Sequence, residues 1–201
     1  MSIRILVVFV LWITPASLSA QNQPEVRPAK DCGTASTIRN RYIFSLQHGR
    51  FGCPGDGKRN LSFHVGPAIP HGVLSDKAGP GLAVTADYVF AITPTWSWDV
   101  RFGHSRFPGT QGQPNTRVLD LSVNLDYAVL RKRPWIFVNG GLGSYFVDAL
   151  NPSLGFNAGA GIGYPLNSRL VGEVIYNFHS TVNATNNVRF SKVQVGVIYS
   201  F

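Results

Sequence analysis

The feature that most constrains this chain is an alternation in its last nine residues, 193–201, to which Ile198 is the one exception. Large apolar side chains occupy every second position, and the residues between them are mostly small or polar. The apolar series is Val193, Val195, Val197, Tyr199 and Phe201. A period of two predicts a β-strand with one apolar and one polar face. In a soluble protein a helical layer or a second sheet would bury that face, but the rest of the chain predicts only more strands. The pattern therefore favours lipid as the cover of the apolar face.

Seven similar segments precede this one, and turn-rich stretches of Gly, Pro and Asn separate them. The expected strands span residues 60–68, 81–92, 95–106, 117–130, 135–147, 154–164, 169–180 and 188–201. Each is long enough to cross a tilted bilayer, which takes roughly 9–11 residues. Long and short connections alternate, as expected for outside loops and periplasmic turns. The sequence therefore predicts an all-β fold, an eight-stranded antiparallel up-and-down transmembrane β-barrel with both ends on the periplasmic side.

The composition agrees with a barrel better than with a helical membrane protein. Only 14% of the 201 residues are charged, and the chain contains 21 Gly and 13 Phe. After residue 20 there is no run of 18 apolar residues, so transmembrane helices are not expected there. A barrel spans lipid without such a run because its polar residues face inward.

The first 59 residues differ from the rest of the chain. Residues 1–20 combine Arg4, a short apolar stretch and small residues ending at Ala20, which predicts a cleaved signal peptide.

Residues 21–59 form a basic extension with a net charge of +4, seven basic minus three acidic residues. This basicity favours anionic headgroups or marks a solvated tail. Cys32 and Cys53 lie in this extension, and in an exported protein such a pair predicts a disulfide, with two free thiols as the alternative. Export also argues against a nucleic-acid partner.

The alternation assigns a set of charged side chains to the barrel interior: Asp87, Asp99, Arg101, Asp120, Asp126, Glu173 and Lys192. Such charges must be paired or hydrated, because an isolated buried ion is costly. Small eight-stranded barrels are just filled by their own side chains. We therefore expect a structural polar network in the lumen, with a narrow path for water or ions as the alternative. Inward glycines of the sixth segment are expected to leave space for Arg101 or Lys192; these glycines are Gly155, Gly159, Gly161 and Gly163.

Aromatic residues close to the short turns predict a girdle at the periplasmic interface. The expected members are Phe90, Trp96, Tyr127, Trp135, Tyr164 and the terminal Phe201.

The sharpest sign of catalysis is His179 next to Ser180, near the outer end of the seventh segment. A serine nucleophile needs a base within hydrogen-bond reach and an acid that orients the base. Adjacent strand residues point to opposite faces, and no acid follows Glu173. The pair thus departs from the His-x-Ser arrangement of the lipid A deacylases, which it otherwise resembles. We expect a protein without enzymatic activity, cofactor or metal, and keep a lipid A-modifying hydrolase as the third alternative.

Three stretches rich in glycine and aromatic residues span 140–145, 158–164 and 195–201. On these stretches, residues 60–201 resemble the outer-membrane protein β-barrel domain family of small OmpA/OmpX-like barrels. The resemblance implies the outer membrane of a Gram-negative envelope, contact with its lipid and lipopolysaccharide, and recognition of Tyr199 and Phe201 by the barrel-assembly machinery. It also implies roles in envelope integrity and in contact with host or surface ligands through the outer loops, or a narrow porin-like channel. The resemblance does not explain residues 21–59. In OmpA proteins a peptidoglycan-binding domain follows the barrel, and we expect none after the barrel of this chain.

Overall fold

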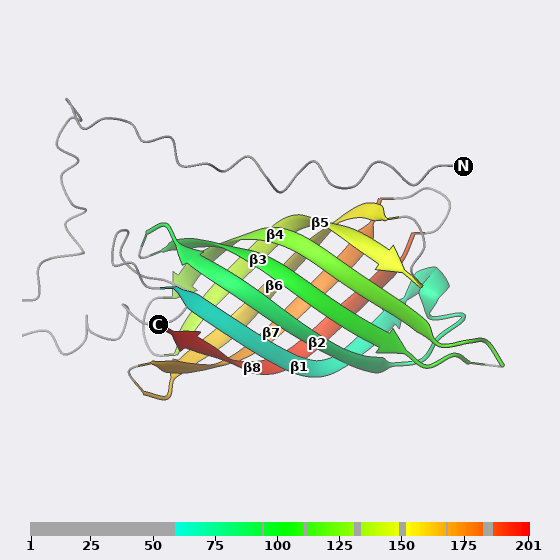
Figure 1. Cartoon of the computed structure of the whole chain (residues 1–201), viewed down its shortest axis with the longest axis horizontal. Helices are drawn as coiled ribbons and strands as arrows, with labels where there is room; N and C mark the ends of the chain where they lie inside the picture. Colours follow the sequence, from blue (N-terminus) through cyan, green and yellow to red (C-terminus); the bar gives the residue numbers. More distant parts are fainter. Residues whose placement is uncertain are drawn as a thin grey trace, which may run out of the picture. The chain divides into compact units, whose positions relative to one another are not determined.

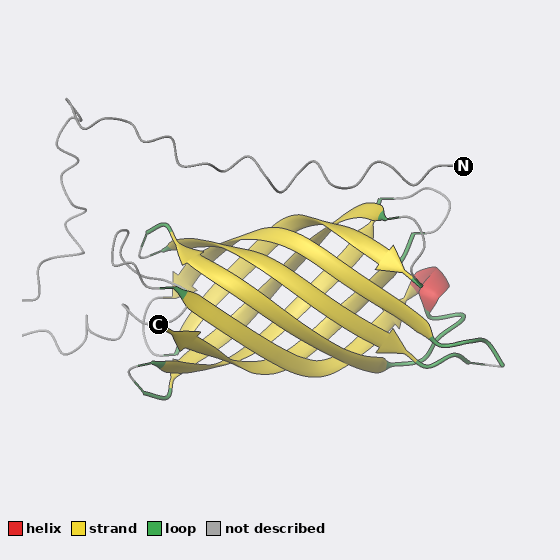
Figure 2. Ribbon diagram, viewed as in Figure 1, coloured by secondary structure: helices red, strands yellow, loops and turns green. Residues whose placement is uncertain are grey.

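The chain forms a closed eight-stranded β-barrel in the computed structural model (Figures 1 and 2). The structure describes residues 59–93, 95–110, 112–130, 134–148, 152–167, 169–182 and 187–201. The strands are β1 (Asn60–His71), β2 (Gly81–Ala91), β3 (Trp96–Phe107), β4 (Thr116–Leu130), β5 (Trp135–Val147), β6 (Ser153–Pro165), β7 (Leu170–Thr181) and β8 (Arg189–Ser200). Each pairs antiparallel with its neighbours in sequence, and β8 pairs with β1 to close the barrel. The expected signal peptide, the extension to residue 58 and the cysteines Cys32 and Cys53 lie outside the described residues.

In these described ranges, no helix has the length and apolar character needed to cross a membrane.

All eight expected strands are confirmed, and seven have ends within one residue of those expected. The exception is β1, for which the expected end at Ala68 is wrong because the strand continues to His71. In the structure Pro70 lies opposite Phe190 of β8, near the end of the barrel. Its fixed φ suits an extended strand there, so β1 runs through it.

Side-chain hydrogen bonds close the short turns at one end of the barrel. Thr93 Oγ1 accepts from the backbone N of Trp96 at 2.9 Å. Asn167 Oδ1 accepts from the backbone N of Arg169 and of Leu170, at 2.8 Å each. Thr and Asn favour turns for this reason. We call this the turn end, and Figure 1 shows that the C-terminus lies there.

The opposite end carries the long connections, and we call it the loop end. The β1–β2 connection contains a 3-10 turn, η2 (Gly72–Leu74), in which Gly72 has a φ of 56°. A glycine adopts this left-handed conformation without the Cβ clash that other residues have. An isolated bridge between Ala78 and Gly109 joins this connection to the β3–β4 connection.

The barrel is apolar outside and polar inside. Along β4 the outward side chains of Leu121 and Val123 are 49% and 55% exposed, whereas inward Asp120 and Asn124 are 1% and 2% exposed. A continuous apolar outer surface of this kind is unfavourable in water. Lipid is the solvent that suits it, because a closed barrel satisfies its backbone hydrogen bonds internally.

Aromatic side chains gather on the outer wall at the turn end, as expected. The Trp96 and Tyr127 rings lie 4.6 Å apart, and both side chains are about 40% exposed. Tyr164 is 56% exposed, and the Phe90 ring stacks on Trp98 at 4.1 Å. The assignment of Trp135 to this girdle is wrong, because its side chain points into the barrel and is only 4% exposed.

Candidate functional site

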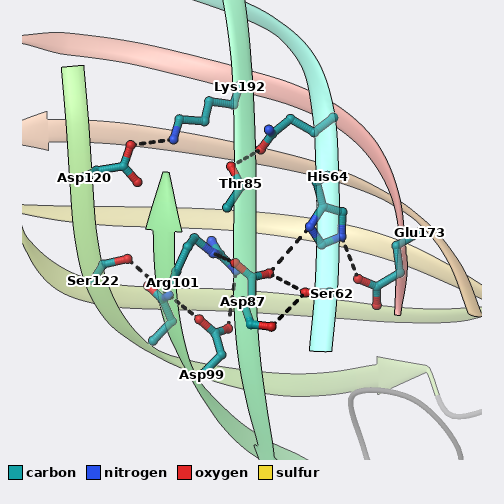
Figure 3. Close-up of polar contacts among 12 residues, drawn as sticks. Ser62, His64, Thr85, Asp87, Asp99, Arg101, Asp120, Ser122, Glu173 and Lys192 are labelled. Atoms are coloured by element: carbon teal, nitrogen blue, oxygen red, sulfur yellow. Dashed lines mark hydrogen bonds and ion pairs between the residues drawn. The ribbon is translucent and has the colours of Figure 1, made fainter. Parts of the chain in front are cut away.

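The structure places all seven charged residues predicted for the lumen in the barrel interior. None of them is more than 3% exposed. They come from β2, β3, β4, β7 and β8, so closure of the sheet brings them together. Close contacts in the interior include acid–base pairs and hydrogen bonds to neutral polar side chains (Figure 3).

A central group forms around Arg101 of β3. Its Nε donates to Asp87 Oδ1 at 2.9 Å, and its Nη2 donates to Asp99 Oδ2 at 3.3 Å (Figure 3). Both carboxylates have further partners: Asn124 Nδ2 donates to Asp99 Oδ1 at 2.6 Å, and Ser62 Oγ donates to Asp87 Oδ2 at 2.9 Å. One guanidinium thus serves two carboxylates through charge-assisted hydrogen bonds, which are stronger than hydrogen bonds between neutral groups.

His64 connects this group to Glu173, and the sequence did not single out this link. Its Nδ1 lies 3.6 Å from Asp87 Oδ2, and its Nε2 lies 3.2 Å from Glu173 Oε2 (Figure 3). His64 and Glu173 flank the same residue of β8, Gly196, in the strand register. A Cβ at Gly196 would collide with the His64 ring. Gly196, an inward-facing glycine of β8, was therefore the feature of the sequence that could have indicated this contact.

A second ion pair joins β8 to β4: Lys192 Nζ donates to Asp120 Oδ1 at 2.6 Å. Gly103 of β3 makes room for it, since a Cβ there would collide with the Asp120 carboxylate and crowd Lys192 Nζ. Asp126, closer to the turn end, accepts from Ser97 Oγ at 2.9 Å.

Apolar clusters lie on both sides of this polar section. The loop-end cluster consists of Ala68, Leu74, Ala78, Ala83, Phe107, Val118, Tyr145 and Phe190. The turn-end cluster consists of Ala128, Trp135, Phe137, Val171, Ile175 and Ile198. Every member is at most 6% exposed. On β4 the inward residues between Val118 and Ala128 are all polar, so that strand passes from one cluster through the polar section to the other.

The space above the β6 glycines does not hold Arg101 or Lys192, and that prediction is wrong. Aromatic side chains of β5 lie against Gly155, Gly161 and Gly163, whereas asparagine side chains lie against Gly159. A Cβ at Gly161 would collide with the Phe137 ring, and one at Gly163 would collide with Trp135. The pairs are direct cross-strand neighbours, Phe137 opposite Gly161 and Trp135 opposite Gly163. The glycines therefore admit two large rings into a narrow barrel.

The His179–Ser180 pair lacks the contact that a nucleophile and its base require. The His179 ring stacks on Phe190 with centroids 4.7 Å apart, and its Nδ1 lies 3.1 Å from the Tyr145 hydroxyl. Ser180 Oγ instead lies 3.3 Å from the side-chain amide of Asn187. Within the described ranges, no group of three His, Cys, Asp or Glu side chains is arranged to hold a metal ion.

Neither a protein-family model nor a curated protein matches this sequence. Among solved structures, the barrel is similar to the crystal structure of Neisserial surface protein A (NspA), with a TM-score of 0.60 and 12% identity over 73% of this chain and 100% of that one. OprG from Pseudomonas aeruginosa scores 0.49 at 10% identity, covering 71% of this chain and 95% of OprG. Ail of Yersinia pestis scores 0.46 at 11% identity, covering 72% of this chain and 99% of Ail. The likeness to NspA shows the fold. Both this fold and the apolar outer wall are those of the small outer-membrane barrels.

Proposed function

We propose that this chain is a non-enzymatic, non-conducting outer-membrane barrel that supports the envelope and presents its loops at the cell surface. The observation that carries this proposal is the layering of the interior. A polar section in which Arg101 and Lys192 are paired with carboxylates lies between two buried apolar clusters. Small eight-stranded barrels hold their own side chains in the lumen and little else.

The layering opposes ion passage on physical grounds. An ion that enters from the loop end meets Phe107, Tyr145 and Phe190, which offer no charge or carboxylate to replace its hydration shell. Further in, Arg101 and Lys192 are already paired with carboxylates of the protein. Displacing such a pair leaves a buried charge unpaired, which costs several kcal/mol.

The partners in this proposal follow from the outer wall and from the end of β8. Outer-membrane lipid and lipopolysaccharide cover the apolar wall, and the loops contact host or surface ligands. The Tyr199 and Phe201 rings lie 4.9 Å apart, and Phe201 is 67% exposed. These two residues are proposed as the signal for the barrel-assembly machinery. Residues 1–20 serve as the signal peptide, and residues 21–59 form an extension closed by a Cys32–Cys53 disulfide.

Two measurements test the proposal. Outer-membrane fractions are first run on an SDS gel with and without boiling, and a folded barrel is expected to change its apparent mass only on boiling. The purified barrel is then inserted into planar bilayers, where a flat baseline is expected. Recovery as a soluble periplasmic protein, or reproducible single-channel steps, would refute the corresponding half of the proposal.

A narrow channel is the second candidate, and one observation favours it. The side-chain amide of Asn139 and the Oδ1 of Asn177 are buried without a hydrogen-bond partner among the described residues. Buried polar atoms of this kind normally bind water, so the middle of the lumen is expected to be hydrated. A hydrated path through both clusters would give conductance steps whose ion selectivity changes in Asp120→Asn.

A further inference from the structure

We propose that the outer wall at the loop end of β2, β3 and β4 binds a phosphorylated and acylated glycolipid of the outer leaflet, namely lipid A, through Arg106 and Arg117. This inference rests on the proposed function, because it requires the loop end to lie at the outer leaflet. It adds a defined site, with a phosphate-binding part and an acyl-chain part.

The phosphate-binding part is a pair of arginines on neighbouring strands. Arg106 of β3 and Arg117 of β4 are direct register partners, and both side chains are exposed on the outer wall. Like charges directly opposite on one sheet face repel each other. Among the described residues, neither guanidinium has a carboxylate partner; the nearby Asp148 accepts from the backbone N of Arg117 at 2.7 Å instead. A phosphate removes the repulsion because it accepts from both guanidinium groups.

The depth of this pair matches the headgroup level. Trp96 lies at the turn-end girdle on β3, and Arg106 lies ten residues further along the same strand. At about 3.3 Å per residue the separation along the strand is about 33 Å. A strand tilt of about 40° reduces this to a height of about 25 Å, which is the height of the apolar band in outer-membrane barrels. The arginine pair therefore lies at the interface opposite to the girdle.

A recess of about 490 Å³ adjoins Arg106, and its lining includes Leu82, His104, Pro108 and Asn115. Its walls are held in place by backbone hydrogen bonds between the β1–β2 connection and the β3–β4 connection. Gly79 N donates to Pro108 O at 2.8 Å, and Thr110 N donates to Lys77 O at 3.0 Å. A polar headgroup thus meets a site that needs little ordering on binding, which favours affinity.

The acyl-chain part is an apolar groove of about 730 Å³ that shares Val84 with the recess. Its lining includes Phe63, Val65, Val84, Ala86, Phe102 and Val195. Phe63, Ala86 and Phe102 are consecutive partners across β1, β2 and β3. The short Ala86 side chain between two phenylalanines forms the floor of the groove. An acyl chain in this groove continues directly from a headgroup in the recess, because Val84 borders both.

The test measures lipid binding to the purified full chain in detergent micelles by native mass spectrometry. The probes are phosphorylated lipid A, dephosphorylated lipid A, phosphatidylglycerol and inorganic phosphate. The variants are R106A/R117A, which removes the phosphate-binding pair, and Ala86→Phe, which fills the groove. Arg169→Ala is the matched control, because it removes an exposed arginine at the turn end.

We expect R106A/R117A to bind phosphorylated lipid A at least tenfold more weakly than the parent chain, and Ala86→Phe to bind it several-fold more weakly. Arg169→Ala should bind like the parent. The parent should also prefer phosphorylated lipid A to the other three probes. Equal binding by R106A/R117A and the parent, or equal binding of phosphorylated and dephosphorylated lipid A, overturns the inference. Binding of inorganic phosphate or phosphatidylglycerol as tight as that of lipid A overturns it too.

Heat-modifiable mobility is measured on every variant so that folding and binding are separated. If R106A/R117A does not fold, the single variants Arg106→Gln and Arg117→Gln take its place with the same expected direction. A folded, non-conducting parent barrel that shows no preference for lipid A overturns this inference and leaves the proposed function intact. Conductance by a parent that does bind lipid A through Arg106 contradicts the proposed function alone.

Discussion

Replacement of Arg101 by Met should destabilise the barrel more than any change of an exposed arginine. Arg101 is 1% exposed and contacts Asp87 and Asp99 at 2.9 and 3.3 Å. Methionine fills most of the volume of the arginine side chain, but it removes the guanidinium that pairs with the buried carboxylates of Asp87 and Asp99. Breaking a buried pair from one side costs about 3–5 kcal/mol. With an m-value of about 2 kcal/mol per molar urea, the unfolding midpoint falls by about 2 M.

The assay is urea unfolding of the barrel in lipid vesicles, followed by the fluorescence of Trp96, Trp98 and Trp135. Arg106→Ala is the control, because it lies on the same strand with its side chain on the outer wall, and it should cost less than about 0.5 kcal/mol. The triple variant D87N/D99N/R101M should recover most of the loss, since it removes the charges together. A midpoint for Arg101→Met equal to that of Arg106→Ala would refute the assignment of Arg101 as the central partner of the lumen.

The remaining predictions concern packing, the second ion pair and assembly. Gly161→Val forces a branched side chain against the Phe137 ring and should cost about 1–3 kcal/mol; an additional Phe137→Ala should relieve the clash, and no relief would contradict the contact. Asp120→Asn removes the carboxylate at 2.6 Å from Lys192 and should lower the unfolding midpoint without opening the lumen, so conductance in this variant would count against a filled interior. Phe201→Ser should reduce the amount of folded barrel in the outer membrane while the purified chain still folds in detergent; normal membrane levels would argue against Phe201 as an assembly signal.

The strand pattern was readable from the sequence because it is local. From Asp120 to Asp126 on β4 an apolar residue follows each polar one, so the parity of these two aspartates assigned both to the interior without any knowledge of their neighbours. The turns were readable for a similar reason, since Asn167 accepts from backbone groups two and three residues ahead. On β5 the apolar Trp135 and Phe137 share a parity with the polar Asn139, so the alternation did not separate two faces, and Trp135 was placed on the wrong one. Its side chain points inward because Gly163 of the next strand leaves space for it.

The contacts in the lumen were not readable in the same way. His64 and Glu173 are 109 residues apart in the chain and meet only because β8 closes onto β1. The glycines of β6 were predicted to accommodate Arg101 or Lys192, whereas rings from β5 lie against three of them. The alternation does not tell which inward residues meet, and it did not place the Trp135 ring in the interior.

The sequence by itself thus determined the number of strands, their direction, the apolar outer wall and, with the exception of Trp135, the residues singled out as facing inward. The alternation can be recognised within a single strand, because successive side chains of one strand point to opposite faces. The tertiary structure decided which inward residues meet: Arg101 with two aspartates, Lys192 with Asp120, and apolar clusters at both ends. Those contacts depend on the stagger and tilt of all eight strands together, which closure of the barrel sets and which no single strand contains.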